Sequence, residues 1–334
     1  MVKARKYVAI KNFKGLPKRE DYEIVEVELP PIKNGEILVK TEWVSVDPYM
    51  RAYKAGLTVP HDQFGYQVGL VEDSKDPRYP VGTRVVSHKG WCDYCVIDTE
   101  EFVEPTGKVY KLPDLDGLSN SLAVGAVGMP GVTAYIGFLN YCEPKAGETV
   151  AVSGAAGAVG SIVGQLAKIK GCRVIGFAGS DDKVKWLEEN GFDKAINYKT
   201  ADIAAALKEA APKGVDCYFD NVGGQLSSVI MQQMNHKGRV VVVGSISSYN
   251  EETIDSVKAT ILQPFILEKR LKVRGYSVWD RLDTFPGAFA ALTKWIKSGE
   301  LKPAEHVTEG FDKIFDAFVG MLQGENIGKA VVKL

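Results

Sequence analysis

The chain has few of the residues that bind metals or form disulfides. Its 334 residues include five cysteines and four histidines. An odd number of cysteines, spread along the chain, does not form a disulfide framework. Cys92 and Cys95 form a C-x-x-C pair, but no second pair and no nearby histidine completes the ligand set of a zinc site. We therefore expect thiols on a strand and its neighbouring turn, and no metal.

Long apolar runs and an excess charge of one sign are also missing. No run approaches the ~20 residues of a membrane span, and the first residues lack the apolar core and cleavage site of a secretory signal. The 41 basic and 42 acidic side chains leave a net charge of −1, which gives no general basic surface for nucleic acid. We expect a cytoplasmic protein with neither membrane nor nucleic acid as a partner.

The few histidines restrict the chemistry that the chain can perform. His61 and His88 precede the other two, and neither lies at a ligand-like spacing from a cysteine. We interpret both as surface residues. Without a zinc ion, oxidation of a simple alcohol is disfavoured. Hydride transfer to a conjugated carbon needs only a hydride donor and hydrogen bonds to the developing enolate oxygen.

The most informative feature that is present is a glycine turn between a strand and a helix. A β-branched run, Thr149–Ser153, leads into Ala155-x-Gly157-x-x-Gly160, and apolar residues then recur at helical spacing. Small residues let the backbone approach a pyrophosphate, and the helix N-terminus offers it N–H groups. An ordinary tight turn is the alternative, but the strand–turn–helix context favours a dinucleotide site.

The pattern along the chain changes near residue 122. Up to Leu122 it is rich in short strands, for which we expect Tyr22–Leu29, Glu36–Val46, Tyr66–Glu72, Thr83–His88 and Tyr94–Asp98. From Ala123 strands and helices alternate, which predicts an α/β fold: a doubly wound parallel sheet of the Rossmann type, preceded by a mainly β domain. We expect residues 1–122 and 310–334 to form the mainly β domain and residues 123–309 to bind the dinucleotide.

The end of the second Rossmann strand bears on the choice of nicotinamide cofactor. An acidic residue there usually holds the ribose of NAD, and Asp181 could serve, although a carboxylate at a helix start is equally natural. Ser180 and Lys183 could instead bind the 2′-phosphate of NADP, unless Lys183 is only a solvated helix lysine. The residues alone lean towards NADP and leave both cofactors open.

Two tyrosines are candidates for a hydrogen bond to an enolate oxygen. Tyr249 follows the predicted strand Arg239–Gly244, at the carboxyl edge of the sheet where doubly wound folds bind ligands. Tyr49 follows a strand in a turn-like segment. Packing with a hydrogen-bonded tip is the alternative for either tyrosine, and position ranks Tyr249 ahead of Tyr49.

Several segments together resemble a known family. They are Val46–Arg51 (VDPYMR), Val127–Tyr135 (VGMPGVTAY), Ala155–Gly160, Gly179–Lys183, Asn197–Lys199, Phe219–Gly224 (FDNVGG) and Glu325–Lys329 (ENIGK). The chain is similar to the medium-chain dehydrogenase/reductases, within them to the zinc-free branch of prostaglandin reductases and plant alkenal double-bond reductases. The zinc-bearing branch would carry Gly-His-Glu where this chain has Gly65-Tyr66-Gln67.

The resemblance implies a GroES-like N-terminal domain and a dimeric, cytoplasmic, NADPH-dependent enzyme. Its reaction would be reduction of the α,β double bond of enals, enones and 15-oxo-prostaglandins, together with NADP-linked oxidation of allylic hydroxyls such as that of leukotriene B4. For this reaction we expect the hydroxyl of Tyr49 or Tyr249 to hold the carbonyl oxygen. The resemblance places around the cofactor Gly157, Ala158, Val159, Gly160, Lys183, Tyr198, Asn221, Val243, Gly244, Ser245, Ile246, Ser247, Ser248, Tyr249, Tyr276, Ser277, Val278 and Asn326.

One departure and two rival functions remain. Where the prostaglandin reductases carry a proline-rich loop, residues 250–275 of this chain are more helical and nearly free of proline. This segment is expected to border the substrate cleft and the dimer interface. The rival functions are a zeta-crystallin-type NADPH quinone reductase and a structural protein that binds NADPH without catalysis.

Overall fold

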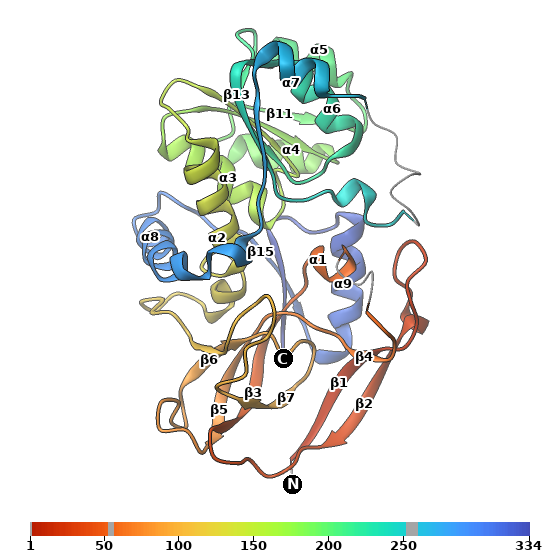
Figure 1. The fold of residues 1–334 in the computed structure, drawn as a ribbon, viewed down its shortest axis with the longest axis vertical. Coiled ribbons are helices and arrows are strands. Elements are labelled where there is room, and N and C mark those ends of the chain that lie inside the picture. Colours follow the sequence, from red (N-terminus) through yellow and green to blue (C-terminus); the bar gives the residue numbers. More distant parts are fainter. Residues whose placement is uncertain (1, 53–56, 252–259) are drawn as a thin grey trace. The chain divides into compact units, whose positions relative to one another are not determined.

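The computed structural model describes residues 2–52, 57–251 and 260–334 in two compact units (Figure 1). One unit comprises Met1–Met129, Glu305–Asn326 and Ala330–Leu334. The other comprises Pro130–Ala304 and Ile327–Lys329. The expected boundaries at residues 122 and 310, between the mainly β domain and the dinucleotide-binding domain, remain predictions.

The first unit is mainly β. Its larger sheet has the strand order β15-β16-β3-β5-β6-β8, with β7 paired to β3, and a smaller sheet has the order β2-β1-β4. The strands are β1 (Lys3–Ala9), β2 (Tyr22–Glu28), β3 (Glu36–Ser45), β4 (His61–Asp62), β5 (Gln67–Ser74), β6 (Arg84–Ser87), β7 (Tyr94–Asp98), β8 (Tyr110–Lys111), β15 (Glu305–Glu309) and β16 (Lys329–Lys333).

The C-terminal strand is an integral part of this larger sheet. β16 runs antiparallel to β3, with Val331 opposite Ser45 and Val332 opposite Val44. The helices of this unit are α1 (Tyr49–Ala52) and α9 (Ile314–Gln323). Helix α9 contributes Phe318 to a core of aromatic and aliphatic side chains that also holds Trp91. The burial of this apolar surface stabilises the unit.

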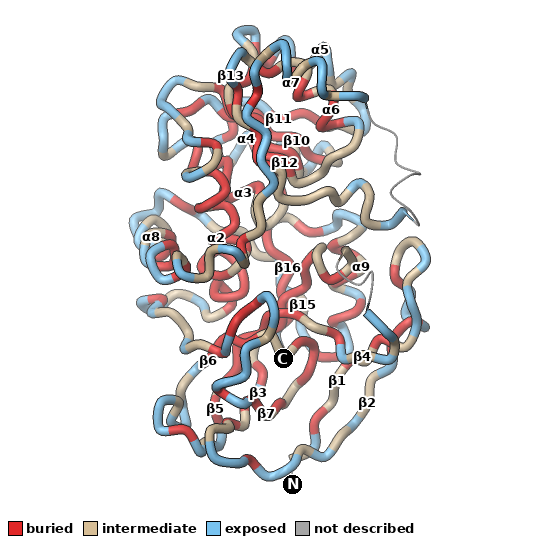
Figure 2. Tube along the Cα trace, viewed as in Figure 1, coloured by how far each residue is buried: buried red, intermediate tan, exposed pale blue. Residues whose placement is uncertain are grey.

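The second unit contains a parallel sheet in the order β11-β10-β9-β12-β13-β14. In chain order this is 3-2-1-4-5-6, the Rossmann arrangement. The strands are β9 (Thr149–Ser153), β10 (Arg173–Ala178), β11 (Lys194–Asn197), β12 (Val215–Asp220), β13 (Met234–Val242) and β14 (Lys272–Gly275). Figure 2 shows the central strands β10 and β12 as buried. The predicted fold class is confirmed.

Helices cover both faces of this parallel sheet. They are α3 (Ala158–Ile169), α4 (Asp181–Glu189), α5 (Ile203–Ala210), α6 (Gly224–Gln232) and α7 (Gln263–Lys269), with α2 (Met129–Ile136), a π-helical turn Gly137–Cys142 and α8 (Phe285–Lys297) beside them. Ile175 and Phe177 pack with α5 and α6. Between them, Gly176 faces Phe192 and Ala155 on the opposite face of the sheet. This alternation places α3 and α5 on different faces.

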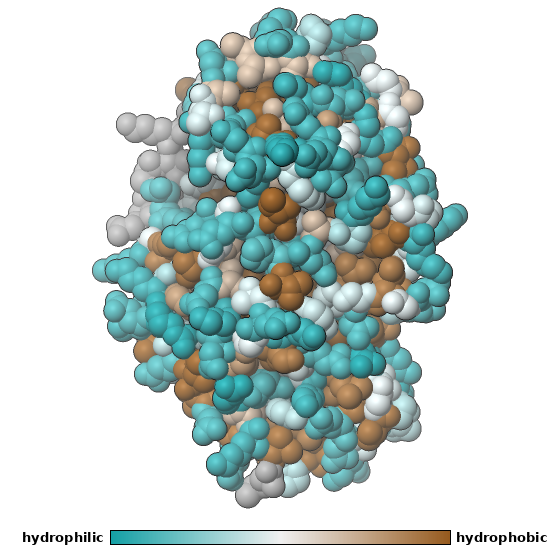
Figure 3. All heavy atoms as spheres, turned by 180° about the vertical axis from the view of Figure 1, so that it is seen from behind, coloured by the Kyte–Doolittle hydropathy of each residue, from teal (hydrophilic) through white to brown (hydrophobic). Residues whose placement is uncertain are grey.

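The divergent segment 250–275 is only partly described. Residues 252–259 lie outside the described residues, and α7 and β14 follow them. In the described part of the chain no helix is long and apolar enough to cross a membrane. Figure 3 shows apolar atoms as separate patches among hydrophilic side chains on one face.

Candidate functional site

The glycine turn connects β9 to α3 with little space for side chains. Gly154 has φ +58°, a left-handed conformation that favours glycine. A Cβ on Gly160 would lie 2.3 Å from the carbonyl oxygen of Gly154, closer than any real Cβ contact. Gly157 precedes the first residue of α3 in an extended conformation. The turn therefore presents backbone and the N–H groups of a twelve-residue helix, which fits a pyrophosphate.

Asn221 forms hydrogen bonds between the end of β12 and the end of β9, the strand that leads into the glycine turn. The backbone N–H of Asn221 donates to Oγ of Ser153 at 2.9 Å, and its side-chain Nδ2 donates to the Ser153 carbonyl at 2.7 Å. Ser153 ends β9 and Asn221 follows β12. The strand order reverses between these two strands, so both residues lie at the switch point where Rossmann folds bind ligands.

A segment near the C-terminus also contacts the turn. The N–H of Gly328 donates to the carbonyl of Ala156 at 2.8 Å, and Gly157 and Gly328 form a parallel bridge. Gly328 has φ +71°. Asn326, two residues earlier, is buried in the mainly β unit.

Two lysines and a tyrosine gather at the end of β10. A Cβ on Gly179 would lie 2.8 Å from Oη of Tyr198 and 3.2 Å from Cε of Lys199. Lys183 lies on α4, which begins after Ser180; the Ser180 Oγ accepts from the Lys183 N–H at 3.4 Å. Burial and the charge of Lys199 lower the pKa of Lys183. Two lysines whose charges interact are suited to a doubly charged phosphate.

Asp181 is engaged differently from a ribose-binding acid. Its Oδ1 accepts from Nδ2 of Asn197 at 2.7 Å, and the side chain that caps α4 is Ser180. The alternative that Asp181 caps the helix is therefore wrong. The alternative in which it holds an NAD ribose loses support because its carboxylate already binds an amide.

The loop after β13 is fixed by hydrogen bonds to the segment after β12. The N–H groups of Val243 and Gly244 donate to the carbonyl of Asp220 at 2.8 and 3.2 Å, and Oγ of Ser247 donates to the carbonyl of Val222 at 2.6 Å. Ile246–Ser248 form a 3-10 turn. This loop follows a central parallel strand, so it lies at the carboxyl edge of the sheet.

Tyr249 folds back over the same loop. Its Oη accepts from the N–H of Ser245 at 3.1 Å, and a Cβ on Gly244 would lie 3.3 Å from that oxygen. The phenol oxygen thus stabilises the loop's conformation and keeps its own hydrogen for another acceptor.

Tyr276 follows the next strand, β14. Its N–H donates to the carbonyl of Val242 at 3.1 Å. Its buried hydroxyl has no hydrogen-bond partner among the described residues, and burial raises its pKa. Ser277 precedes the 3-10 segment Val278–Thr284, and Val278 is buried. An orphaned buried hydroxyl at this edge is the kind of group that a bound ligand satisfies.

Tyr49 lies in the mainly β unit, paired with a histidine. It opens α1, and its Oη lies 3.0 Å from Nε2 of His88, the residue after β6. His88 is partly buried, and desolvation lowers its pKa to about 4. The interpretation of His88 as a surface residue is therefore wrong: its ring is buried enough to remain neutral at physiological pH. The same reading of His61 holds only in part, because its Nε2 is buried.

The Gly65-Tyr66-Gln67 segment carries an amide network. Oε1 of the fully buried Gln67 accepts from Thr41 at 2.9 Å, and its Nε2 donates to Sγ of Cys95 at 3.1 Å. Sγ of Cys92 lies 3.6 Å from the same Oε1. Both thiols are buried, Cys95 on β7 and Cys92 in the preceding turn. Over residues 2–52, 57–251 and 260–334, no three His, Cys, Asp or Glu side chains gather as metal ligands would.

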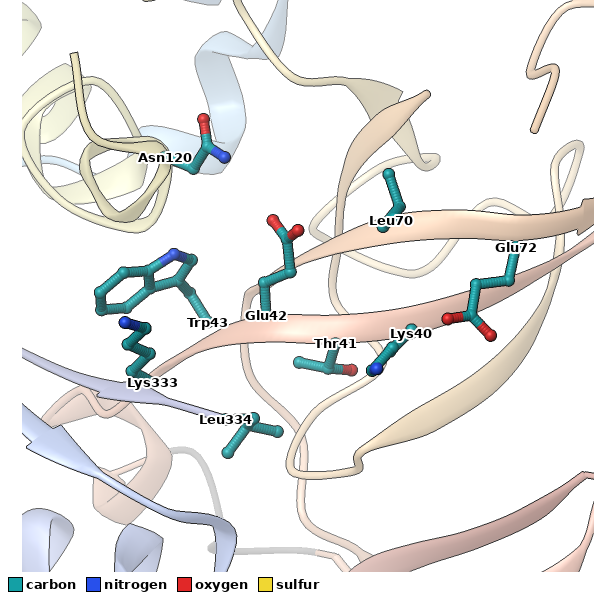
Figure 4. A pocket seen from close by; sticks show the side chains of 9 residues that line it. All are labelled: Lys40, Thr41, Glu42, Trp43, Leu70, Glu72, Asn120, Lys333 and Leu334. Atoms are coloured by element: carbon teal, nitrogen blue, oxygen red, sulfur yellow. The ribbon is translucent and has the colours of Figure 1, made fainter. Parts of the chain in front are cut away.

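The mainly β unit also carries an open groove at its surface (Figure 4). Its lining includes the charged side chains of Lys40 and Glu42 on β3, Glu72 on β5 and Lys333 on β16. None of the predicted site residues lines this groove.

The fold and the glycine turn define a medium-chain dehydrogenase/reductase. A family model described as the N-terminal domain of oxidoreductase matches residues 5–104, and one described as zinc-binding dehydrogenase matches residues 158–297. Prostaglandin reductase 1 of Bos taurus is 46% identical over 335 residues, which cover all of both chains. The chain belongs to the prostaglandin reductase and alkenal reductase family of this class.

Two further similarities extend over nearly the whole chain. The NADP(+)-dependent 2-alkenal reductase of Nicotiana tabacum is 39% identical to this chain. The alignment covers 98% of this chain and 97% of the reductase. The crystal structure of CurA from Vibrio vulnificus in complex with NADPH has a TM-score of 0.90 and 34% identity, with 98% of each chain covered.

Lys199 and His88 lie beside predicted site residues, and no prediction from the sequence included them. Lys199 stands in the Asn197-Tyr198-Lys199 segment, so its place beside Tyr198 was a usable signal. His88 is brought to Tyr49 by tertiary contact alone, over a separation of 39 residues, and no local pattern marks it.

Proposed function

We propose that the protein reduces the α,β double bond of enals, enones and 15-oxo-prostaglandins with NADPH. The observation that carries the cofactor is the pair Lys183 and Lys199 beside Tyr198, at the end of the second Rossmann strand. The substrate class comes from the relatives, which are prostaglandin and alkenal reductases. NADPH, when bound, supplies the hydride for the β-carbon of the substrate.

Each part of this cofactor would be held by a different set of residues. Gly157, Ala158, Val159 and Gly160 would hold the pyrophosphate, because their backbone forms the turn and the start of α3. Lys183 and Tyr198, with Lys199, would hold the 2′-phosphate. The rest of the cofactor would lie against Asn221, Val243, Gly244, Ser245, Ile246, Ser247, Ser248, Tyr249, Tyr276, Ser277, Val278 and Asn326.

The remaining chemistry needs hydrogen bonds to the carbonyl oxygen. When a double bond conjugated to a carbonyl gains a hydride, negative charge develops on that oxygen, and a phenol O–H aimed at it stabilises the transition state. Tyr49 and Tyr249 are the two proposed donors. Each has an N–H or imidazole nitrogen at its oxygen already. A tyrosine or water then protonates the α-carbon.

A panel of acceptors separates this function from its rivals. We expect NADPH oxidation, followed by nicotinamide absorbance, with alkenals, enones and 15-oxo-prostaglandins. Faster turnover of quinones would identify a quinone reductase. Tight NADPH binding without turnover of any acceptor would identify a non-catalytic binding protein. The reverse reaction, NADP-linked oxidation of an allylic alcohol such as leukotriene B4, belongs to the same panel.

We further propose a cytoplasmic homodimer. β14 forms the edge of the parallel sheet and all four of its residues are exposed. In the segment that precedes β14, Ile261 and Leu267 are 73% and 80% exposed. Val273 on this strand is also exposed, and an open edge strand with exposed apolar side chains is a surface that a second copy can cover. Leu267→Asp should lower the mass measured by light scattering from two chains to one, whereas Val307→Asp, at an exposed position of β15, should not.

A further inference from the structure

Tyr49 is attached to an aromatic cluster that ends in a neutral imidazole. The His88 ring stacks on Phe64, with centroids 6.0 Å apart at 26°, and Tyr66 packs edge-on at 4.8 Å and 75°. The Tyr49 ring lies 6.1 Å from the same imidazole at 23°. These contacts, together with the 3.0 Å approach of Oη to Nε2, restrict both rings to one relative arrangement.

Burial of His88 favours the neutral form of its imidazole. Among the residues that the structure describes, the phenols of Tyr49 and Tyr66 contact its ring, and the neighbouring Lys89 is bound to Glu101 at 2.6 Å. Burial is the cause that lowers the pKa of His88. A neutral imidazole carries one hydrogen, on either Nδ1 or Nε2, so it can accept from Tyr49 or donate to it but not both.

We propose that His88 is a positioning residue for Tyr49, whose oxygen accepts the Nε2–H of His88 and whose own O–H is thereby directed to the substrate carbonyl. In the Nδ1–H tautomer, the phenol hydrogen of Tyr49 would point to Nε2 of His88. The phenol oxygen would then face the carbonyl oxygen of the substrate with no hydrogen between them. An N–H donated to the phenol oxygen also stabilises charge on that oxygen, which makes Tyr49 a better hydrogen-bond donor. His88 gains and loses no proton in this role.

The inference rests on the proposed reduction of enals and enones. One of its tests, the tautomer of His88, can be measured without any enzymatic activity. With only four histidines in the chain, imidazole nitrogens can be resolved by ¹⁵N–¹H correlation spectra, and His88→Phe identifies the signals of His88. We expect the neutral Nε2–H tautomer from pH 5 to 9. An Nδ1–H tautomer, or titration of His88 near pH 6.5, would overturn the proposal whatever the enzyme's activity.

Kinetics of matched variants give the second test. His88→Phe keeps the ring stack but removes the donor, and it should lower kcat for an enone about tenfold, the value of one hydrogen bond, without changing the KM for NADPH. His88→Gln, which retains an N–H, should recover most of this loss. In a Tyr49→Phe background, His88→Phe should cost less than twofold.

Two results would contradict the positioning role. One is a full additional loss from His88→Phe in the Tyr49→Phe background, since this would show that His88 acts on stability or by another route. The other is equal damage from His88→Gln and His88→Phe at equal thermal stability. If the unmodified protein reduces no enal or enone, the proposed function fails instead, and the tautomer measurement distinguishes that case.

Discussion

Nδ2 of Asn221 donates a hydrogen bond to the carbonyl oxygen of Ser153 at 2.7 Å, which joins the ends of β12 and β9. These strands are neighbours in the sheet although the bonded residues lie 68 positions apart in the sequence. In the sequence, β10, β11 and three helices lie between β9 and β12. The bond therefore lies where a Rossmann sheet opens for its ligand, beside the glycine turn.

Lys183→Ala should weaken the binding of NADPH and leave the binding of NADH unchanged. A charge-assisted hydrogen bond to a phosphate is worth roughly 1.5–3 kcal/mol, so the KM for NADPH should rise about 10- to 100-fold. The KM for NADH, which lacks the 2′-phosphate, should stay within about twofold. Lys185→Ala is the matched control, because Lys185 lies on the same helix with a side chain 76% exposed. Equal effects of Lys183→Ala on both cofactors would show that the lysine does not contact the phosphate.

The KM for NADPH should also depend on pH on the alkaline side. The pKa of Lys183 is lowered by burial and by Lys199, so the free protein loses this positive charge at a lower pH than an ordinary lysine would. Because only the charged form attracts the phosphate, the KM for NADPH should rise as pH increases through that lowered pKa. The KM for NADH should stay flat over the same range, and Lys183→Ala should flatten the NADPH profile.

Gly160→Ala should disrupt the phosphate turn. The new Cβ would lie 2.3 Å from a backbone oxygen, and backbone cannot yield as a side chain can. Overpacking of this kind costs about 1–3 kcal/mol, with a lower melting temperature and weaker binding of both NADPH and NADH. Gly287→Ala is the control, since nothing lies within 4 Å of the added carbon on α8. Unchanged cofactor binding in Gly160→Ala would mean that the turn does not hold the pyrophosphate.

Substitution of Tyr49 should affect kcat, and substitution of Tyr249 should affect the KM for NADPH. Tyr49→Phe removes a donor to the enolate oxygen and should lower kcat about 100-fold, with the KM for NADPH unchanged. Tyr249→Phe removes the acceptor of the Ser245 N–H and should loosen the loop after β13, which raises the KM for NADPH. The reverse pattern would assign the enolate contact to Tyr249, as its position in the sequence ranked it.

The parts of the fold that could be predicted are those with a repeating apolar pattern. β7 and β9 begin and end at the predicted residues, because β7 alternates and β9 runs apolar between turn residues. β14 and β15 were not predicted, since these strands bury almost none of their side chains. β13 begins at Met234 rather than Arg239, because its first residues are polar and its register with β12 shifts at Cys217.

The site divides along similar lines. The glycine turn, Lys183 and Tyr198 carry local signals that the family resemblance sharpened. Lys199 and His88 matter through contacts that only the folded chain makes: Lys199 reaches Gly179 from the next strand, and His88 reaches Tyr49 from β6. Such contacts depend on the packing of elements far apart in the sequence.

Transfer of deuterium from NADPH shows which carbon of the substrate the protein reduces. NADPH deuterated at C4 of the nicotinamide is incubated with the protein and an enone, and the product is examined by NMR. The account predicts a saturated ketone that carries deuterium on the β-carbon, with the carbonyl intact. Deuterium on the carbonyl carbon, giving an allylic alcohol, or no transfer from NADPH to any member of the panel, would contradict it.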